Sequence, residues 1–231
     1  DSAGGRVCLS RHGFVRTATF TCAAVSADSV TYQLTDNEQT RAAYPFAFCL
    51  SVTHELRGRT LTTRYTVENT GDQVLPFVIG GHPAFRVPLT ADERFEDYQI
   101  VFEQAETASC PLLDADGLVC TARRRPLLTA QTTLPLSHDL FVEDALLFES
   151  LRSRRVRLVS TKSGHGVELA FAGMPYFALW SPVKHAPFVC LEPWTGTATT
   201  DAEDDVFEHK RGMTLLPPGG RHTVSYAITV F

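Results

Sequence analysis

The sequence contains no uninterrupted apolar run of the roughly 18 residues that a membrane-spanning helix requires. It also has no excess of basic residues, because 26 acidic residues outnumber 21 basic ones and the formal net charge is -5. Nucleic-acid binding depends on a basic face that displaces counterions from phosphates. We therefore expect neither a membrane protein nor a nucleic-acid binder.

Residue spacings typical of metal sites are absent too. The six cysteines form no C-x-x-C pair and no zinc-type spacing. Because a chain of 231 residues can bury a core without disulfides, we expect reduced, structural cysteines and a cytoplasmic location. Five of the eight histidines are scattered through the second half of the chain without ligand spacing, so no metal site is expected among them; they are His138, His165, His185, His209 and His222.

Apolar and polar residues alternate with a period of two through most of the chain. The run Phe46, Phe48, Leu50 and Val52 is one example, and the C-terminal run from Val224 is another. Turn-forming glycines and prolines separate these runs, whereas helical signal is weak and confined to short candidates at 92–98 and 137–148. This pattern predicts an all-β fold, either a β-sandwich or a barrel-like pair of sheets, as a single domain over 1–231.

His82 lies in the segment Gly-Gly-His-Pro-Ala-Phe, at the predicted end of a strand. The two glycines allow a sharp turn that can present the imidazole into a cleft. A histidine there titrates near neutral pH and suits proton transfer, but it also fits an ordinary surface turn. The motif alone does not distinguish a proton-transfer residue from a histidine in a surface turn.

Glu192 follows an apolar run and precedes Pro193 and Trp194. A carboxylate partly buried against an indole has a raised pKa, which suits a general base. The alternative is a glutamate at the end of a strand in a surface loop.

Two further segments carry polar side chains suited to binding hydroxyl groups. His12 and Arg16 lie close together near the start of the chain, and Asp144 interrupts an apolar run. A carboxylate in such a place needs hydrogen-bond donors, from the protein or from a ligand. Arg16 could instead pair with a surface acid.

Five segments, in this order, resemble the aldose 1-epimerase (galactose mutarotase-like) superfamily, and most closely its LacX-like branch. They are HGFVR, GGHPAF, DALLF, FALWSP and LEPWTG. The resemblance implies an antiparallel β-sandwich, the galactose mutarotase-like supersandwich, and an isomerase that interconverts the α and β anomers of a hexose or related sugar. It implies a small-molecule sugar as substrate and no metal or organic cofactor, and it carries no indication of oligomeric state.

The resemblance also implies roles for particular residues. Glu192 matches the family's general base and His82 its general acid, while His12, Arg16 and Asp144 match substrate-binding positions. Trp180 and Trp194 are candidates either for contacting the sugar or for packing in the core.

Relatives in this superfamily usually carry additional strands before the HGF-type motif, whereas this chain begins at Asp1. We therefore expect a domain short of N-terminal strands. No charged segment followed by an apolar stretch opens the chain, so we expect no intact secretion signal.

Three functional alternatives follow from these observations. The leading one is a mutarotase, and the second is a non-catalytic carbohydrate-binding or sensor protein with the same fold. A lyase or hydrolase is a weaker third, because glycoside hydrolysis usually needs two carboxylates at one bond. The arginine runs at 123–125 and 152–157 are either solvated faces or a site for a sugar phosphate.

Overall fold

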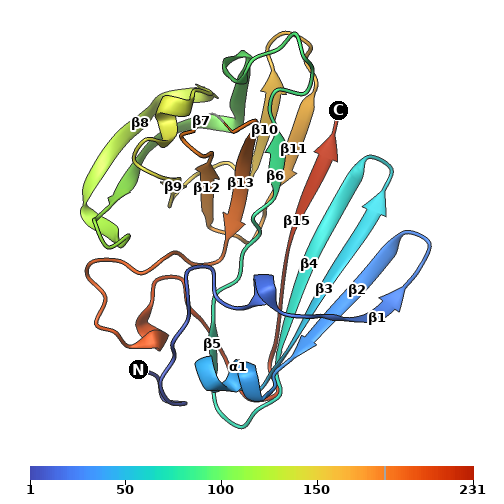
Figure 1. The fold of residues 1–231 in the computed structure, drawn as a ribbon, viewed down its shortest axis with the longest axis vertical. Coiled ribbons are helices and arrows are strands. Elements are labelled where there is room, and N and C mark those ends of the chain that lie inside the picture. Colours follow the sequence, from blue (N-terminus) through green and yellow to red (C-terminus); the bar gives the residue numbers. More distant parts are fainter. Residues whose placement is uncertain (185) are drawn as a thin grey trace. The chain divides into compact units, whose positions relative to one another are not determined.

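The computed structural model describes residues 1–184 and 186–231, which group into two compact units (Figure 1). The first unit contains Asp1–Val78 and Glu203–Ser225, and the second contains Ile79–Ala202 and Tyr226–Phe231. Strand β15 (Arg221–Val230) contributes residues to both. That they form one aldose 1-epimerase-like domain stays a prediction.

The first unit is built around four antiparallel strands in the order β1-β2-β3-β4. Its elements are η1 (Val15–Thr17), β1 (Thr21–Val25), β2 (Ser29–Thr35), α1 (Glu38–Ala43), β3 (Phe48–Arg57), β4 (Thr60–Asn69), β5 (Leu75–Phe77), η4 (Phe207–His209) and β14 (Thr214–Leu216). Strands β3 and β4 pair along their whole length, and Gly58 takes a positive φ of 58° in the tight turn between them. Phe46, Phe48 and Leu50 are buried as the alternation predicts, although β3 begins only at Phe48.

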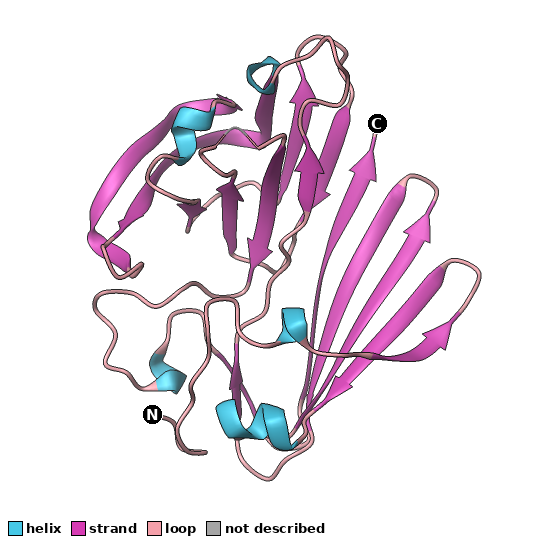
Figure 2. Ribbon diagram, viewed as in Figure 1, coloured by secondary structure: helices cyan, strands magenta, loops and turns pink. Residues whose placement is uncertain are grey.

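The second unit contains two antiparallel sheets (Figure 2). Its elements are β6 (Ala84–Arg86), η2 (Phe95–Asp97), β7 (Tyr98–Leu113), β8 (Val119–Pro135), η3 (His138–Phe141), β9 (Leu146–Phe148), β10 (Arg155–Ser160), β11 (Gly166–Ala170), β12 (Tyr176–Trp180) and β13 (Phe188–Trp194). One sheet runs in the order β11-β10-β7-β8, with the end of β15 beside β11, and the other runs β6-β13-β12-β9.

Phenylalanine rings join these two sheets. Phe102 of β7 contacts Phe148 of β9 with ring centroids 5.8 Å apart. Phe171, just after β11, stacks on Phe177 of β12 at 5.0 Å. Aromatic pairs of this kind stabilise a core beyond the area that they bury. The predicted antiparallel sandwich is therefore confirmed, with its core between the faces of the two sheets.

The helical elements differ from the sequence prediction. Segment 92–98 contains only the short turn η2 before Tyr98 opens β7, and segment 137–148 contains η3 and strand β9. Their irregular apolar spacing offers no continuous face that a longer helix would bury. Helix α1 was not predicted; its N-terminus is closed by a capping box between Asn37 and Thr40. Among the described residues, no helix has the length and apolar character needed to cross a lipid bilayer.

Candidate functional site

The outer face of the small sheet in the second unit carries the candidate site. Alternate residues of a strand point to opposite faces, so Phe177 faces the phenylalanine core and Ala178 and Trp180 face away from it. Across the strand pair, Ala178 lies opposite Glu192 and Trp180 lies opposite Cys190. Because directly opposed residues share a face, these four side chains occupy the outer face together.

His82 is placed on this same face by the register of its neighbours. Gly80 forms a bridge with Trp194, and Ala84 pairs with Cys190. Counting inward from both pairs puts His82 directly opposite Glu192. The predicted turn histidine is thus a cross-strand neighbour of the predicted base.

Two backbone hydrogen bonds hold His82 in this position. The Gly81 N–H donates to the Pro193 carbonyl at 2.9 Å, and the Leu191 N–H donates to the Pro83 carbonyl at 3.1 Å. These bonds lie on either side of His82 and fix its backbone against β13. The backbone of His82, which lies between the Gly80–Trp194 bridge and β6, is thereby held against β13.

Both glycines before His82 are needed for close approach. A Cβ on Gly80 would lie 2.3 Å from Trp194 Cδ1, and a Cβ on Gly81 would lie 2.5 Å from Tyr226 Cε1. Either contact is far inside the van der Waals limit, so a larger residue would push the segment away from β13 at Gly80 and away from Tyr226 of β15 at Gly81. The glycines serve packing here, because neither has a positive φ.

His82 Nε2 lies 3.3 Å from Glu192 Oε2. The two side chains differ in environment, since 43% of the His82 side chain is exposed and only 3% of the Glu192 side chain. Glu192 is therefore buried within β13 and does not lie in a surface loop. The imidazole of His82 is open to solvent, whereas the carboxylate of Glu192 is largely shielded from bulk water.

Burial, and to a smaller extent the negative charge of Asp144, raises the pKa of Glu192 to about 8. An apolar cluster of Val119, Leu147 and Ala178 on this face supplies the low-dielectric surroundings. A carboxylate with a raised pKa is a stronger base than an ordinary glutamate.

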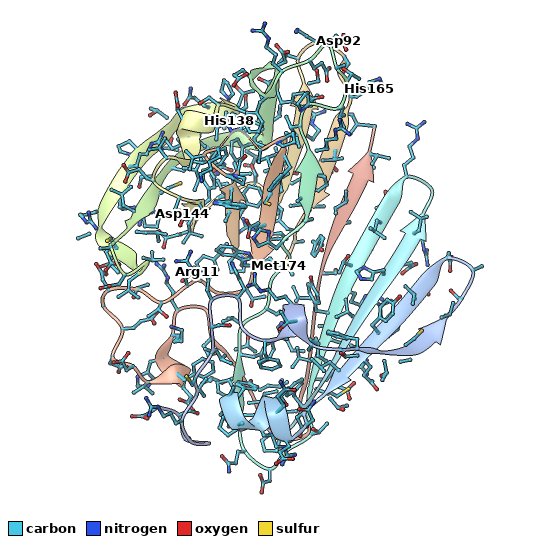
Figure 3. The ribbon with its side chains drawn as sticks, viewed as in Figure 1. Arg11, Asp92, His138, Asp144, His165 and Met174 are labelled. Atoms are coloured by element: carbon cyan, nitrogen blue, oxygen red, sulfur yellow. The ribbon has the colours of Figure 1, made fainter. Side chains whose placement is uncertain are left out.

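Asp144 lies between η3 and the start of β9 (Figure 3). Its φ of 83° is a left-handed conformation that few residues other than glycine adopt. The Ala145 N–H donates to Asp144 Oδ1 at 2.8 Å, which orients the carboxylate. Such local strain is concentrated at functional positions, where surrounding structure maintains it.

The two tryptophans have different surroundings. The Trp180 ring meets the His82 ring edge to face, with centroids 6.3 Å apart. Trp194 packs against Gly80 and against the apolar cluster around Ala178. Trp180 is therefore a wall of the candidate site, whereas Trp194 is mainly a packing residue.

His12 and Arg16 belong to the first unit, whereas His82, Asp144 and Glu192 belong to the second. His12 has a positive φ of 69°, and Arg16 is exposed in η1. Their predicted contacts with a sugar stay predictions.

The arginine runs are engaged by the protein itself. Arg124 Nη1 lies 2.6 Å from Glu149 Oε2, Arg125 donates to the Leu140 carbonyl and Arg155 donates to Glu103. A surface pocket of about 400 Å³ lies beside the first run, lined by Leu112, Arg124, Arg125, Asp139, Val142 and Glu143. Because this lining contains acids as well as arginines, it does not favour a phosphate dianion.

Sequence spacing missed one feature of the outer face. One donor atom each of His82, Cys190 and Glu192 lies within 4.8 Å of the others, a metal-type set formed across strands. It is the one such group in the described part of the chain. Of the scattered histidines, His138 stacks on Phe95, and His185 lies outside the described residues. The spacing Cys190-x-Glu192 places both side chains on one face of a strand, and this was the signal available in the sequence. The sequence does not show that His82 lies opposite Glu192, so the third member of the set could not be predicted from it.

The chain is similar to known proteins over nearly its whole length. The profile of the Aldose 1-epimerase family matches residues 6–229. Protein LacX (plasmid) of Lactococcus lactis subsp. lactis is 37% identical over 224 residues, covering 96% of this chain and 75% of that protein. This chain thus spans about three quarters of that relative's length.

Solved structures agree with this assignment. A galactose mutarotase related enzyme from Lactobacillus acidophilus superimposes with a TM-score of 0.93 at 33% identity, covering 100% of this chain and 77% of that one. A galactose mutarotase-like protein from Lactobacillus casei superimposes with a TM-score of 0.86 at 28% identity, covering 97% and 77%. The strand pairing, the profile match and these relatives together show that the chain belongs to the aldose 1-epimerase family, with a galactose mutarotase-like fold.

Proposed function

We propose that this protein is an aldose 1-epimerase that interconverts the α and β anomers of a hexose or related sugar. The observation that carries the proposal is the pairing of His82 and Glu192, with 3.3 Å between their nearest nitrogen and oxygen atoms. Anomer exchange needs an acid and a base that act on two oxygens bonded to the same carbon. Two proton-transfer groups this close together fit that requirement.

The reaction begins with the ionised form of Glu192, the state populated as pH rises toward its pKa of about 8, accepting the proton of the C1 hydroxyl. As the C1 oxygen forms a carbonyl, the bond between C1 and the ring oxygen breaks, and His82 donates a proton to that oxygen. The C1–C2 bond then rotates and presents the other face of the aldehyde. On closure, the ring oxygen attacks C1 and returns its proton to His82, while Glu192 gives its proton back to the new C1 hydroxyl.

The environments of the two residues support these roles. Burial makes Glu192 a stronger base by raising its pKa to about 8, and the exposed imidazole of His82 can meet a sugar arriving from solvent. Each positioned proton transfer contributes typically about 10²–10⁴-fold to a rate.

We further propose that Asp144 accepts hydrogen bonds from sugar hydroxyls and that Trp180 contacts the apolar face of the sugar ring. The oriented carboxylate of Asp144 and the ring contact between Trp180 and His82 support these roles. His12 and Arg16 are proposed as further hydroxyl ligands on the family resemblance alone.

The direct test is the rate of anomer exchange, followed by NMR saturation transfer on a panel of free and phosphorylated aldoses. We expect the wild-type protein to accelerate exchange of at least one aldose well above the rate in buffer. Calorimetry on the same panel examines the alternative of a carbohydrate-binding protein. Sugar binding with an exchange rate equal to that in buffer would support that alternative and reject the enzyme.

A further inference from the structure

The proposed mechanism makes no use of Cys190, a buried thiol on the same face of β13 as Glu192. Yet donor atoms of Cys190, Glu192 and His82 all lie within 4.8 Å of one another. Imidazole nitrogen, thiolate sulfur and carboxylate oxygen are the ligand types that bind zinc in proteins. This mixture suits a cation of borderline softness better than Mg²⁺ or Ca²⁺, which prefer oxygen ligands.

The distances suit four-coordinate binding. Zinc lies about 2.0–2.3 Å from its ligand atoms, so the ligands of a tetrahedral site are about 3.3–3.8 Å apart. The 3.3 Å between His82 Nε2 and Glu192 Oε2 already meets this spacing. The 4.8 Å limit on the other pairs leaves a closure of about 1 Å, which small side-chain rotations supply.

The backbone holds these three residues in place. Cys190 and Glu192 are two residues apart on a strand paired on both sides, and His82 is fixed by the flanking hydrogen bonds to β13. In a tetrahedral site with three protein ligands, the fourth position would be taken by water or a sugar hydroxyl, and 43% of the His82 side chain is exposed to the solvent from which either would come. Asp144 adds a second negative charge within electrostatic reach of Glu192, which favours a cation.

We propose that His82, Cys190 and Glu192 bind one Zn²⁺ ion, or a borderline divalent ion like it, and that the bound ion inhibits the protein. On binding, the Cys190 thiol, the protonated fraction of Glu192 and the protonated fraction of His82 release their protons to solvent, and the Cys190 sulfur bonds to the ion. The lone pair of His82 Nε2 and the carboxylate of Glu192 bond to the same ion, so neither can transfer a proton. The inhibitory half rests on the proposed anomer exchange, whereas the binding half does not.

Binding is tested with Co²⁺ as a spectroscopic substitute for Zn²⁺, added to full-length protein that has been freed of metal with EDTA. We expect one equivalent to bind and to give the near-ultraviolet charge-transfer band of a cobalt–thiolate bond. Cys190→Ser should lose this band and weaken binding by at least about 10–100-fold, the range that loss of even an outer-shell partner produces. Cys110→Ser is the matched control, because Cys110 is also buried but lies on β7.

A second variant separates the loss of a metal ligand from misfolding, because Cys190→Ser changes a buried residue. His82→Asn changes a partly exposed side chain and should weaken Co²⁺ binding over the same range while the circular dichroism spectrum is unchanged. The proposal is overturned if the wild-type protein gives no thiolate band, or if Cys190→Ser binds Co²⁺ as tightly as the wild type does.

Inhibition is tested separately with Zn²⁺. One equivalent should lower the anomer-exchange rate of the wild-type protein at least about tenfold, and EDTA should restore it. The ratio of rates with and without Zn²⁺ should be closer to one in Cys190→Ser. Undiminished exchange in the Zn²⁺-loaded protein overturns the inhibitory half. If the metal-free protein shows no exchange on any sugar, the proposed function fails while the Co²⁺ result still decides the binding half.

Discussion

At the scale of single residues, the burial of Glu192 has opposite effects on the stability of the protein and on the basicity of the carboxylate. Burial of a carboxylate is unfavourable for stability unless partners compensate, and the charge of Asp144 adds to the cost. The same burial raises the pKa of Glu192 to about 8 and so strengthens it as a base. A position that lowers stability in exchange for reactivity is typical of functional sites.

Glu192→Gln therefore should not destabilise the protein. Glutamine has nearly the same shape and carries no charge, so we expect a midpoint of urea unfolding equal to or above that of the wild type. Leu191→Ala, which removes a buried apolar side chain from the other face of β13, should lower the free energy of unfolding by about 2–5 kcal/mol. A Glu192→Gln protein as unstable as Leu191→Ala would show that the carboxylate is structurally required.

Trp180→Ala tests the proposed sugar contact. We expect KM for the preferred aldose to rise about 10-fold with little change in kcat, because aromatic contacts of this kind hold the ring without taking part in proton transfer. Trp180→Phe keeps an apolar face and should recover most of the lost affinity. An unchanged KM in Trp180→Ala would assign the ring to packing alone.

At the scale of elements, the short strand β6 determines the position of His82. Its pairing with β13 places His82 beside Glu192. The sequence predicted both motifs, and the fold resemblance implied that they meet. Local patterning did not reveal which register joins them, because pairing between distant strands leaves no local trace.

Gly80→Ala tests this pairing. The added Cβ would meet Trp194 and the Pro193 carbonyl, so we expect the free energy of unfolding to fall by about 1–3 kcal/mol and the anomer-exchange rate to fall with it. Gly164→Ala is the control, since its Cβ meets nothing within 4 Å but its φ of 75° adds strain. The control should lose stability and keep its exchange rate; equal rates in both variants would show that the packing of Gly80 on Trp194 does not position His82.

A second element-scale feature is the buried Glu93, which joins the segment before β7 to β10. Glu93 accepts hydrogen bonds from Ser160 and Tyr98, and these lower its pKa to about 2. Because the folded-state pKa lies below the unfolded value of about 4.3, Glu93 stabilises the protein above about pH 4.3 and loses that contribution as pH falls toward 2.

Glu93→Gln should therefore be less stable than the wild type near pH 7, and the difference should shrink as the pH falls from about 4.3 toward 2. Urea unfolding across this pH range measures it. Asp92→Asn, at the exposed neighbouring acid, should show little difference at any pH. A constant difference for Glu93→Gln across the range would contradict the assigned hydrogen bonds.

At the scale of the whole molecule, sequence patterning predicted the fold class well and the site in part. Alternating runs such as Phe46 to Leu50 identified strands, because strand periodicity is local. Placing Cys190 beside His82 required the β6–β13 pairing, and α1 was missed because its capping box at Asn37 precedes too short an apolar pattern. The two compact units left no composition change or linker in the sequence.

The cysteines give a test at this scale. With EDTA present, a thiol-specific aromatic disulfide reagent should label Cys8 and Cys22 quickly, because both are exposed. Cys49, Cys110, Cys120 and Cys190 are buried free thiols and should react only on unfolding. Mass spectrometry of the labelled peptides identifies each site, and fast labelling of Cys190 in the folded protein would contradict its burial.

The central claim is that His82 and Glu192 together exchange the anomers of a sugar. It is tested most directly by comparing saturation-transfer rates of wild type, His82→Asn, Glu192→Gln and the exposed control His165→Asn on one aldose. We predict that His165→Asn matches the wild type, while His82→Asn and Glu192→Gln each fall by about 10²–10⁴-fold at unchanged folding. Exchange by either of these two variants at the wild-type rate would contradict the claim.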